Sequence, residues 1–241
     1  MSQPKIAPYG SWRSPITSDL IVAEAIGLGD VLLDGEDVYW IEGRPQEAGR
    51  NVVVRAGADV TPPGFNARTR VHEYGGGAFA VQDGTVYFSN FADQRLYRQD
   101  VGQPPRALTP PAAVGALRYA DGVIDRRRGR LICVHEDHTR PGQAINTLAS
   151  VDLSGAQAPK VLVSGNDFYS TPRLSPDGER LAWLTWNHPD MPWVAAEAWV
   201  GDIQADGTVA TARRIAGGPD EAVFQPSQAR RWPSGLRRGV E

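Results

Sequence analysis

The sequence predicts an all-β protein built from β-propeller blades, each a sheet of four antiparallel strands. Two observations lead to this fold class. A glycine turn between two apolar runs recurs at a nearly constant spacing, and the same order of short strands follows each turn. Helical periodicity, by contrast, is almost absent, and no alternation of strands with helices occurs. Glycine (26) and proline (19) are abundant, as expected for many short strands joined by turns.

The turns define the repeat. Successive turn glycines are 49, 45 and 49 residues apart, at Gly35, Gly84, Gly129 and Gly178. Three of them follow an aspartate, and an Asp-Gly pair between apolar runs is a strong hairpin signal because glycine accepts the positive φ of a tight turn. Four units of about 45–50 residues indicate a repeat architecture such as a propeller.

Each unit is expected to contain four strands. The strand after the turn is expected in Asp34–Gly43, Asp83–Asn90, Arg128–Asp137 and Asp177–Trp186. The next is expected in Asn51–Arg55, Arg95–Val101, Thr147–Leu153 and Glu197–Ile203. Preceding strands are expected in Gly76–Gln82 and Ser170–Ser175, and final strands in Arg106–Thr109, Lys160–Val163 and Arg213–Ala216. Four strands per unit is the pattern of propeller blades, which bury their faces only against neighbouring blades.

The domain boundaries follow from the repeat. Residues 31–226 are expected to form the propeller, after an N-terminal extension at 1–30 in which Ser18 could cap a short helix within Ser18–Gly29. A fifth unit is expected to begin at Gly217–Gln228. A closed propeller has about 4–8 blades. About four blades plus the start of a fifth therefore predict an incomplete propeller.

The last segment, residues 227–241, departs from the repeat. It is an irregular basic tail with two arginine pairs and no strand pattern. We interpret it as an out-of-frame or otherwise truncated end, because a GC-rich gene read in the wrong frame tends to encode Gly, Arg, Pro and Ser. The alternative is an ordinary solvated basic tail. Sequencing the gene beyond codon 226 and translating all frames separates the two.

Composition restricts the possible partners and compartment. A net charge of -3 and a pI of about 5.8 give no basic surface for nucleic acid or an anionic membrane. No apolar run is long enough to span a membrane, and the first residues lack the apolar segment of a signal peptide. The single cysteine, Cys133, excludes an intramolecular disulfide and favours the cytoplasm. No cofactor is expected.

Motifs for catalysis are missing. A hydrolase nucleophile elbow needs G-x-S-x-G, which the sequence does not contain, so we expect no catalytic residue and no activity of this chain alone. The stretch His135–His138 (HEDH) suggests a metal, but histidines three apart in a strand point to opposite faces. We expect no metal there and favour a solvated loop; an independent metal hydrolase is the weakest alternative. Cys133 is expected in the core.

Three segments carry a family resemblance: Tyr9–Thr17, Arg68–Val81 and Leu174–Trp193. Over roughly residues 9–226, the chain resembles the amino-terminal propeller of prolyl-oligopeptidase-family serine peptidases. More narrowly, it is similar to the bacterial dipeptidyl-aminopeptidase/acylaminoacyl-peptidase branch. The resemblance implies a propeller of usually seven blades over an α/β-hydrolase domain that carries a Ser-Asp-His triad and cleaves short peptides. The hydrolase domain would lie downstream, so we expect a chain truncated before it.

The resemblance also suggests a site in His72–Gly77 (HEYGGG). It implies that Arg70, Glu73 and Tyr74 lie near the face where propeller meets hydrolase, where a carboxylate could pair with the amino terminus of a peptide. The alternative is a strand entry with a tight connection between blades, since three glycines allow close backbone approach.

The tryptophans near the fourth turn have a structural explanation. We expect Trp183 to pack between blades, and Trp186 and Trp193 to anchor the loop that they flank. An aromatic peptide-binding cage is the alternative.

The function expected from these observations is that of a non-catalytic propeller portion of a serine peptidase. In the intact enzyme it would gate and help bind short peptides, which are its expected partners. The alternative, from a different class, is a stand-alone propeller that serves as a scaffold for protein–protein interaction.

Overall fold

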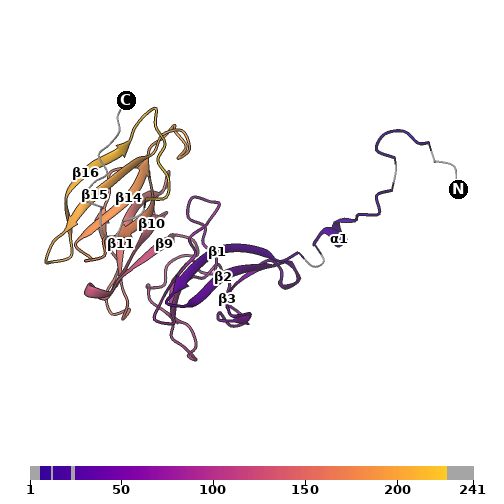
Figure 1. Cartoon of the computed structure of the whole chain (residues 1–241), viewed down its shortest axis with the longest axis horizontal. Helices are drawn as coiled ribbons and strands as arrows, with labels where there is room; N and C mark the ends of the chain where they lie inside the picture. Colours follow the sequence, from indigo (N-terminus) through magenta and orange to yellow (C-terminus); the bar gives the residue numbers. More distant parts are fainter. Residues whose placement is uncertain (1–5, 12, 23–24, 227–241) are drawn as a thin grey trace.

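The computed structural model describes residues 6–11, 13–22 and 25–226. Within these residues, four antiparallel sheets of four strands each follow one another along the chain (Figure 1). They do not close into a ring, and the segment that carries the short helix α1 (Ser18–Val22) extends away from them. The predicted all-β class, an incomplete propeller of four blades, is confirmed.

The strands run in order through each blade. Blade 1 contains β1 (Gly27–Asp34), β2 (Asp37–Arg44), β3 (Arg50–Arg55) and β4 (Ala58–Asp59). Blade 2 contains β5 (Phe79–Gln82), β6 (Thr85–Ser89), β7 (Leu96–Gln99) and β8 (Arg106–Ala107). Blade 3 contains β9 (Leu117–Asp125), β10 (Arg130–Asp137), β11 (Ile145–Asp152) and β12 (Lys160–Val163). Blade 4 contains β13 (Phe168–Leu174), β14 (Arg180–Trp186), β15 (Glu197–Ile203) and β16 (Val209–Gly217). Two 3₁₀ turns, η1 (Pro45–Glu47) and η2 (Arg126–Arg128), lie in loops.

The predicted turns are present. All four repeat glycines adopt positive φ, with φ of 62°, 75°, 62° and 69° at Gly35, Gly84, Gly129 and Gly178. The first strands of the blades lie side by side, because β1 contacts β5, β5 contacts β9 and β9 contacts β13. The spacing of the glycines therefore reports a true structural repeat.

The edges of the propeller differ from expectation. Strand β1 starts at Gly27, so blade 1 begins inside the range expected to be an extension. Helix α1 is capped by Thr17 rather than Ser18, since the Leu20 N–H donates to Thr17 Oγ1 at 3.1 Å. In the described part of 217–228, residues 217–226, the expected opening strand of a fifth blade is not formed; after Gly217, Gly218 and Glu221 make an isolated bridge. The tail at 227–241 lies outside the described residues.

The core consists of three layers, one between each pair of neighbouring blades. Tyr39 and Val53 of blade 1 pack on Phe88 of blade 2, and the other two layers join blade 2 to blade 3 and blade 3 to blade 4. Blade faces are thus buried only against neighbours, as a propeller requires. On the far side of blade 1, Val31 and Leu33 are 66% and 72% exposed, because no described sheet covers them.

The first turns of the blades are also connected in series. The Asp34 carboxylate of blade 1 accepts from the backbone N–H of Asp83 (3.0 Å) and of Gly84 (2.6 Å) in blade 2. Arg126 of blade 3 then pairs with Asp83 at 2.7 Å, and Arg127 pairs with Glu179 of blade 4 at 2.9 Å. Each blade is tied to the next at the same position of the repeat.

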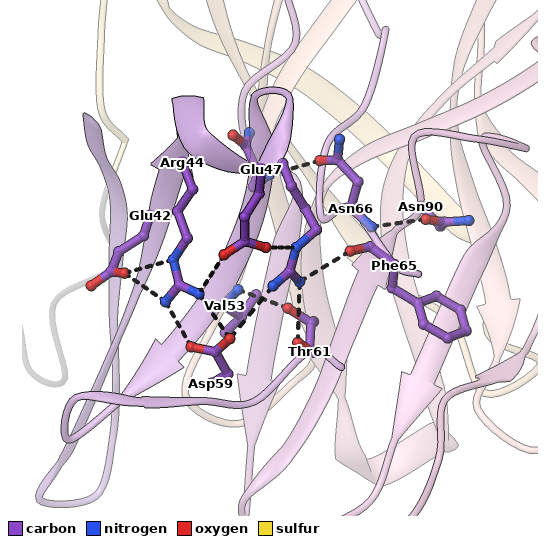
Figure 2. Close-up of polar contacts among 11 residues, drawn as sticks. Glu42, Arg44, Glu47, Val53, Asp59, Thr61, Phe65, Asn66 and Asn90 are labelled. Carbon is purple, nitrogen blue, oxygen red and sulfur yellow. Dashed lines mark hydrogen bonds and ion pairs between the residues drawn. The ribbon is translucent and has the colours of Figure 1, made fainter. Parts of the chain in front are cut away.

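Polar side chains fix the outer edge of blade 1 and the connection to blade 2. Figure 2 shows Arg44 between three carboxylates, with the bonds to Glu42 (2.7 Å) and Asp59 (2.6 Å) the shortest. In the same view, Asn66 accepts from the Asn51 N–H at 3.0 Å and donates its own N–H to Asn90 Oδ1 at 3.1 Å. These bonds hold the start of the connection, residues 66–78, against both blades.

Among the described residues, no helix is long and apolar enough to cross a membrane.

Candidate functional site

The connection between blades 1 and 2 crosses to blade 3 at His72. The His72 N–H donates to Glu136 Oε1 on β10 at 2.7 Å, and the Asp121 N–H on β9 donates to the Gly77 carbonyl at 2.7 Å. His72 and Glu73 both have positive φ, 54° and 65°, a strained conformation for residues with a side chain. The tight inter-blade connection considered as the alternative is present, and it places the candidate residues beside blade 3.

Close approach explains two of the three glycines directly. A Cβ on Gly75 would lie 2.7 Å from the Thr69 carbonyl oxygen. A Cβ on Gly77 would lie 2.9 Å from the Asp121 backbone, whereas a Cβ on Gly76 would meet nothing within 4 Å, although both residues have positive φ. We expect Gly77→Ala to lower the free energy of unfolding by about 2–3 kcal/mol, and Gly76→Ala by about 1 kcal/mol from backbone strain alone. Urea denaturation measures both, and equal losses would show that the contact with Asp121 does not matter.

The structure gives the side chains of the three predicted site residues different contacts. Glu73 has a side chain that is 77% exposed and pairs with Arg118 at 2.6 Å. Tyr74 is also exposed. The Arg70 guanidinium, however, lies 4.6 Å from the centre of the Phe91 ring, and only the Arg70 carbonyl joins the site, by accepting from Arg118 Nη1 at 2.9 Å. The cation beside Glu73 is therefore Arg118, which the sequence did not single out.

A buried carboxylate, Glu136, organises this part of the molecule. Its Oε1 accepts from the His72 N–H, while its Oε2 lies 3.0 Å from His138 Nε2 and 3.5 Å from Arg118 Nη1. Arg118 thus stands between Glu136 and Glu73. The hydrogen bond from Arg118 holds the pKa of Glu73 below its usual range, so the exposed carboxylate is ionised at neutral pH.

A pocket of about 360 Å³ opens beside Glu73, between the connection and the loops of blades 3 and 4. It is lined by His72, Glu73, Glu136, His138, Gln143, Ala144, Asn146, Asp167, Phe168 and His188. Three of these residues carry carboxylates. Among the described residues, Arg118 is the one guanidinium that pairs with Glu73 and Glu136, whereas Asp167 Oδ2 lies 3.2 Å from His188 Nδ1. The charge around the pocket favours a cationic group on a ligand.

The segment HEDH divides between two environments. His135 on β10 packs against the ring of Tyr119, with ring centroids 5.0 Å apart, whereas His138 faces Glu136. The loop interpretation was wrong for His135, Glu136 and Asp137, which belong to β10. In the part of the chain that the structure describes, no group of three or more His, Cys, Asp or Glu is placed to hold a metal ion.

The other sequence expectations concern packing. Cys133 is buried, as predicted, and burial raises the pKa of its thiol. Trp183 packs between blades 3 and 4, also as predicted. Trp193 is 69% exposed and does not anchor its loop through burial. Trp186 is buried and stacks on Phe168, with ring centroids 5.3 Å apart, so it belongs to the wall behind the pocket rather than to the loop.

Burial of histidines predicts a pH dependence. Burial lowers the pKa of His135 and of His72. Because the unfolded imidazole has a pKa of about 6.5, their contribution to stability is complete above that pH and is lost as the pH falls through the lower folded pKa. We expect the melting temperature to decrease from pH 7 towards pH 5, and less steeply in His135→Gln, as measured by calorimetry. Comparison of the variant with the parent chain isolates the contribution of His135 to this pH dependence. Asp121 contributes in the opposite direction, because burial raises the pKa of its carboxyl. Parallel curves would contradict the prediction.

The four unclosed blades define the chain as part of a β-propeller. Over this fold it is similar to a puromycin-hydrolyzing peptidase of Mycobacterium tuberculosis, with 37% identity and a TM-score of 0.82, over 91% of this chain and 36% of that chain. A puromycin hydrolase is 39% identical, with a TM-score of 0.82, over 91% of this chain and 37% of its own. A mutant puromycin hydrolase complexed with PGG is 38% identical, with a TM-score of 0.83, over 93% of this chain and 37% of its own.

The resemblance to the amino-terminal propeller of prolyl-oligopeptidase-family peptidases is therefore confirmed. The chain spans little more than a third of the length of these structures. No model of a protein family matches the chain, and no curated protein sequence matches it.

Proposed function

We propose that this chain is the propeller portion of a prolyl-oligopeptidase-like serine peptidase of the dipeptidyl-aminopeptidase/acylaminoacyl-peptidase type. In that enzyme it gates access and helps to bind short peptides, while a hydrolase domain carries the catalytic residues. The similarity to puromycin hydrolases, one of them complexed with PGG, supports this proposal.

The observation that carries the binding role is the Glu73 carboxylate at the edge of the pocket. It is exposed and ionised, and Arg118 holds it in place at 2.6 Å. Arg118 does not neutralise the site, because Glu136 shares its charge and Asp167 adds a further carboxylate. A peptide ammonium can therefore make a charge-assisted hydrogen bond to Glu73.

Binding of a blocked and a free peptide to Glu73→Gln tests this role. We expect triglycine to bind the variant about tenfold more weakly than the parent chain, because a hydrogen bond between charged groups is lost. N-acetyltriglycine should bind both equally, and calorimetric or NMR titration measures the four affinities. In an intact peptidase that carries this propeller, the same variant should raise KM for free-amine peptides only.

Glu179 provides a matched control. It is an exposed carboxylate in a comparable ion pair, with Arg127 at 2.9 Å, in a turn of blade 4 that does not line the pocket. Glu179→Gln should leave both affinities unchanged. If Glu73→Gln weakens the free and the blocked peptide equally, Glu73 does not recognise the amine.

We also place the protein in the cytoplasm, as the single buried Cys133 suggests. Cell fractionation with an antibody against the propeller tests this, and recovery from a secreted fraction would contradict it.

A further inference from the structure

A second cavity lies at the other end of strand β5 from the pocket beside Glu73. The connection that carries Glu73 leads into the first residue of β5, whereas Gly84, in the turn after β5, lines this second cavity. The second cavity has a volume of about 410 Å³ and shares no lining residue with the pocket beside Glu73. This volume lies at the lower end of the range for small-molecule sites. A ligand bound here would be recognised by a separate set of groups.

Apolar side chains from two blades line the cavity. Val60 and Pro62 follow strand β4 of blade 1. Val101 and Pro104 lie in the turn between β7 and β8 of blade 2. The Gln99 side chain joins the two walls, because its Nε2 donates to the Val60 carbonyl at 2.7 Å. The walls are therefore in place before a ligand arrives, which lowers the cost of binding an apolar group.

Arg55 is the one cationic residue that lines the cavity. Both of its hydrogen bonds use Nη1, to Tyr39 Oη at 3.3 Å and to Asp37 Oδ2 at 3.4 Å. Nη2 and Nε have no hydrogen-bond partner among the described residues. The Arg55 and Asp37 side chains are 40% and 54% exposed, so this long ion pair is weak. The guanidinium therefore keeps donors and charge for a ligand.

The carboxylates that line the cavity are already paired. Asp59 bonds to Arg44 at 2.6 Å (Figure 2), and Asp100 bonds to Arg98 at 2.7 Å. Hydrogen bonds from these arginines hold the pKa of both carboxyls below their usual range, so both are ionised at neutral pH and balanced by a close cation. The weakly paired charge in the cavity is therefore the positive charge of Arg55, which favours an anionic group on a ligand.

The other blade junctions show how this gap differs. At the next junction, Arg106 of blade 2 donates to the Ser154 carbonyl at 2.9 Å, in the turn between the third and fourth strands of blade 3. At the junction after that, Arg130 of blade 3 donates to the Gly207 carbonyl at 2.7 Å, in the corresponding turn of blade 4. Among the described residues, no arginine of blade 1 donates to the corresponding turn of blade 2, and Arg55 bonds within its own blade. The first junction thus retains an arginine that does not cross it.

We infer that this cavity binds a small ligand in which a carboxylate is joined to a short apolar body. The carboxylate accepts charge-assisted hydrogen bonds from Arg55, and the apolar body lies among Val60, Pro62 and Val101. Free aliphatic acids and the carboxyl termini of peptides that end in an aliphatic residue share this chemistry. The inference does not depend on the proposed role of Glu73, because the two cavities have no residue in common.

Three small probes test the inference on the chain as it is. 4-Methylpentanoate, its neutral amide and acetate are titrated by NMR. We expect 4-methylpentanoate to bind roughly tenfold more tightly than the amide, because the amide loses a hydrogen bond between charged groups. It should bind at least about tenfold more tightly than acetate, because the apolar body is removed from water. Equal affinity of the acid and either of the other probes would overturn the inference.

Variants locate the binding. Arg55→Gln should abolish the preference for the acid over the amide, and Val101→Ser should reduce the preference for 4-methylpentanoate over acetate. Val101 is 66% exposed, so its substitution leaves the core intact. Arg127→Gln is the matched control, because Arg127 is an exposed arginine paired with Glu179 and does not line the cavity. Thermal melting checks that each variant is folded, and unchanged preferences in the folded variants would overturn the inference.

N-acetyl-leucine distinguishes the two sources of the ligand. It carries the same carboxylate and branched chain as 4-methylpentanoate, with an added amide that represents the rest of a peptide. Tighter binding of N-acetyl-leucine supports the inference with a peptide terminus as the ligand, and tighter binding of 4-methylpentanoate supports it with a free acid. If neither probe shifts the backbone amide signals of residues 101–103, the cavity is not the binding site and the inference is overturned.

Discussion

Asp125→Ala is expected to lower the free energy of unfolding by about 3–5 kcal/mol, because it leaves a buried cation without its partner. Asp125 is 1% exposed and accepts from Arg130 Nε at 2.9 Å and from Arg128 Nη1 at 3.2 Å. Arg130 is itself buried and reaches across to blade 4, where its Nη1 donates to the Gly207 carbonyl at 2.7 Å. Without Asp125, two guanidinium groups would share this junction with no buried carboxylate.

Urea denaturation of the variant measures the loss, and Asp83→Ala is the control. Asp83 pairs with Arg126 at 2.7 Å, but both side chains are largely exposed. An exposed pair contributes less than about 1 kcal/mol, so the control should be little affected. Similar losses in the two variants would show that burial of the Asp125 carboxylate does not determine its contribution.

Trp183→Ala is expected to lower the free energy of unfolding by a similar amount, about 3–5 kcal/mol, because packing contacts are lost and a cavity remains. Trp183 is 2% exposed and belongs to the core layer between blades 3 and 4, together with Leu148 of blade 3 and Ile203 of blade 4. The neighbouring backbone is already close, since a Cβ on Gly201 would lie 3.4 Å from the Trp183 ring. Rigid β-strands on both sides limit collapse into the cavity.

Trp193→Ala is the matched control for this substitution. Both changes remove an indole, but Trp193 is exposed and outside the three core layers. Its loss should change the free energy of unfolding by less than about 0.5 kcal/mol. Thermal and urea denaturation measure both variants, and a small effect of Trp183→Ala would mean that blades 3 and 4 do not depend on this contact.

The blades could be predicted because their signals are local. An Asp-Gly turn and the alternation that follows it occupy about ten neighbouring residues, and strands such as β12 and β15 match their expected ranges. Strand β9 was not predicted, because it contains Asp121 and Gly122 in its middle and ends in a 3₁₀ turn of three arginines. The composition of that segment is typical of a loop, and pairing with β10 overrides it.

The site could be predicted only in part, because its partners are distant in the sequence. Glu73 was found, but Arg118 lies 45 residues further along the chain, and Glu136 lies 64 residues after His72. Arg70 was grouped with Glu73 by proximity in sequence, yet its side chain stacks on Phe91. The packing of blade 3 against the connection decides which side chains meet, and no single segment contains that information.

The bonds that link the first turns of neighbouring blades affect how the stability of one blade depends on the next. Asp34, Asp83 and Glu179 each make a bond to an adjacent blade. Blades 2 and 3 therefore have two neighbours, whereas blades 1 and 4 have one among the described residues. Such a row behaves as a one-dimensional series of coupled units, in which each blade is stabilised mainly by its immediate neighbours. The connection that carries Glu73 enters blade 2 and bonds to blade 3, so the position of Glu73 depends on the packing of both blades.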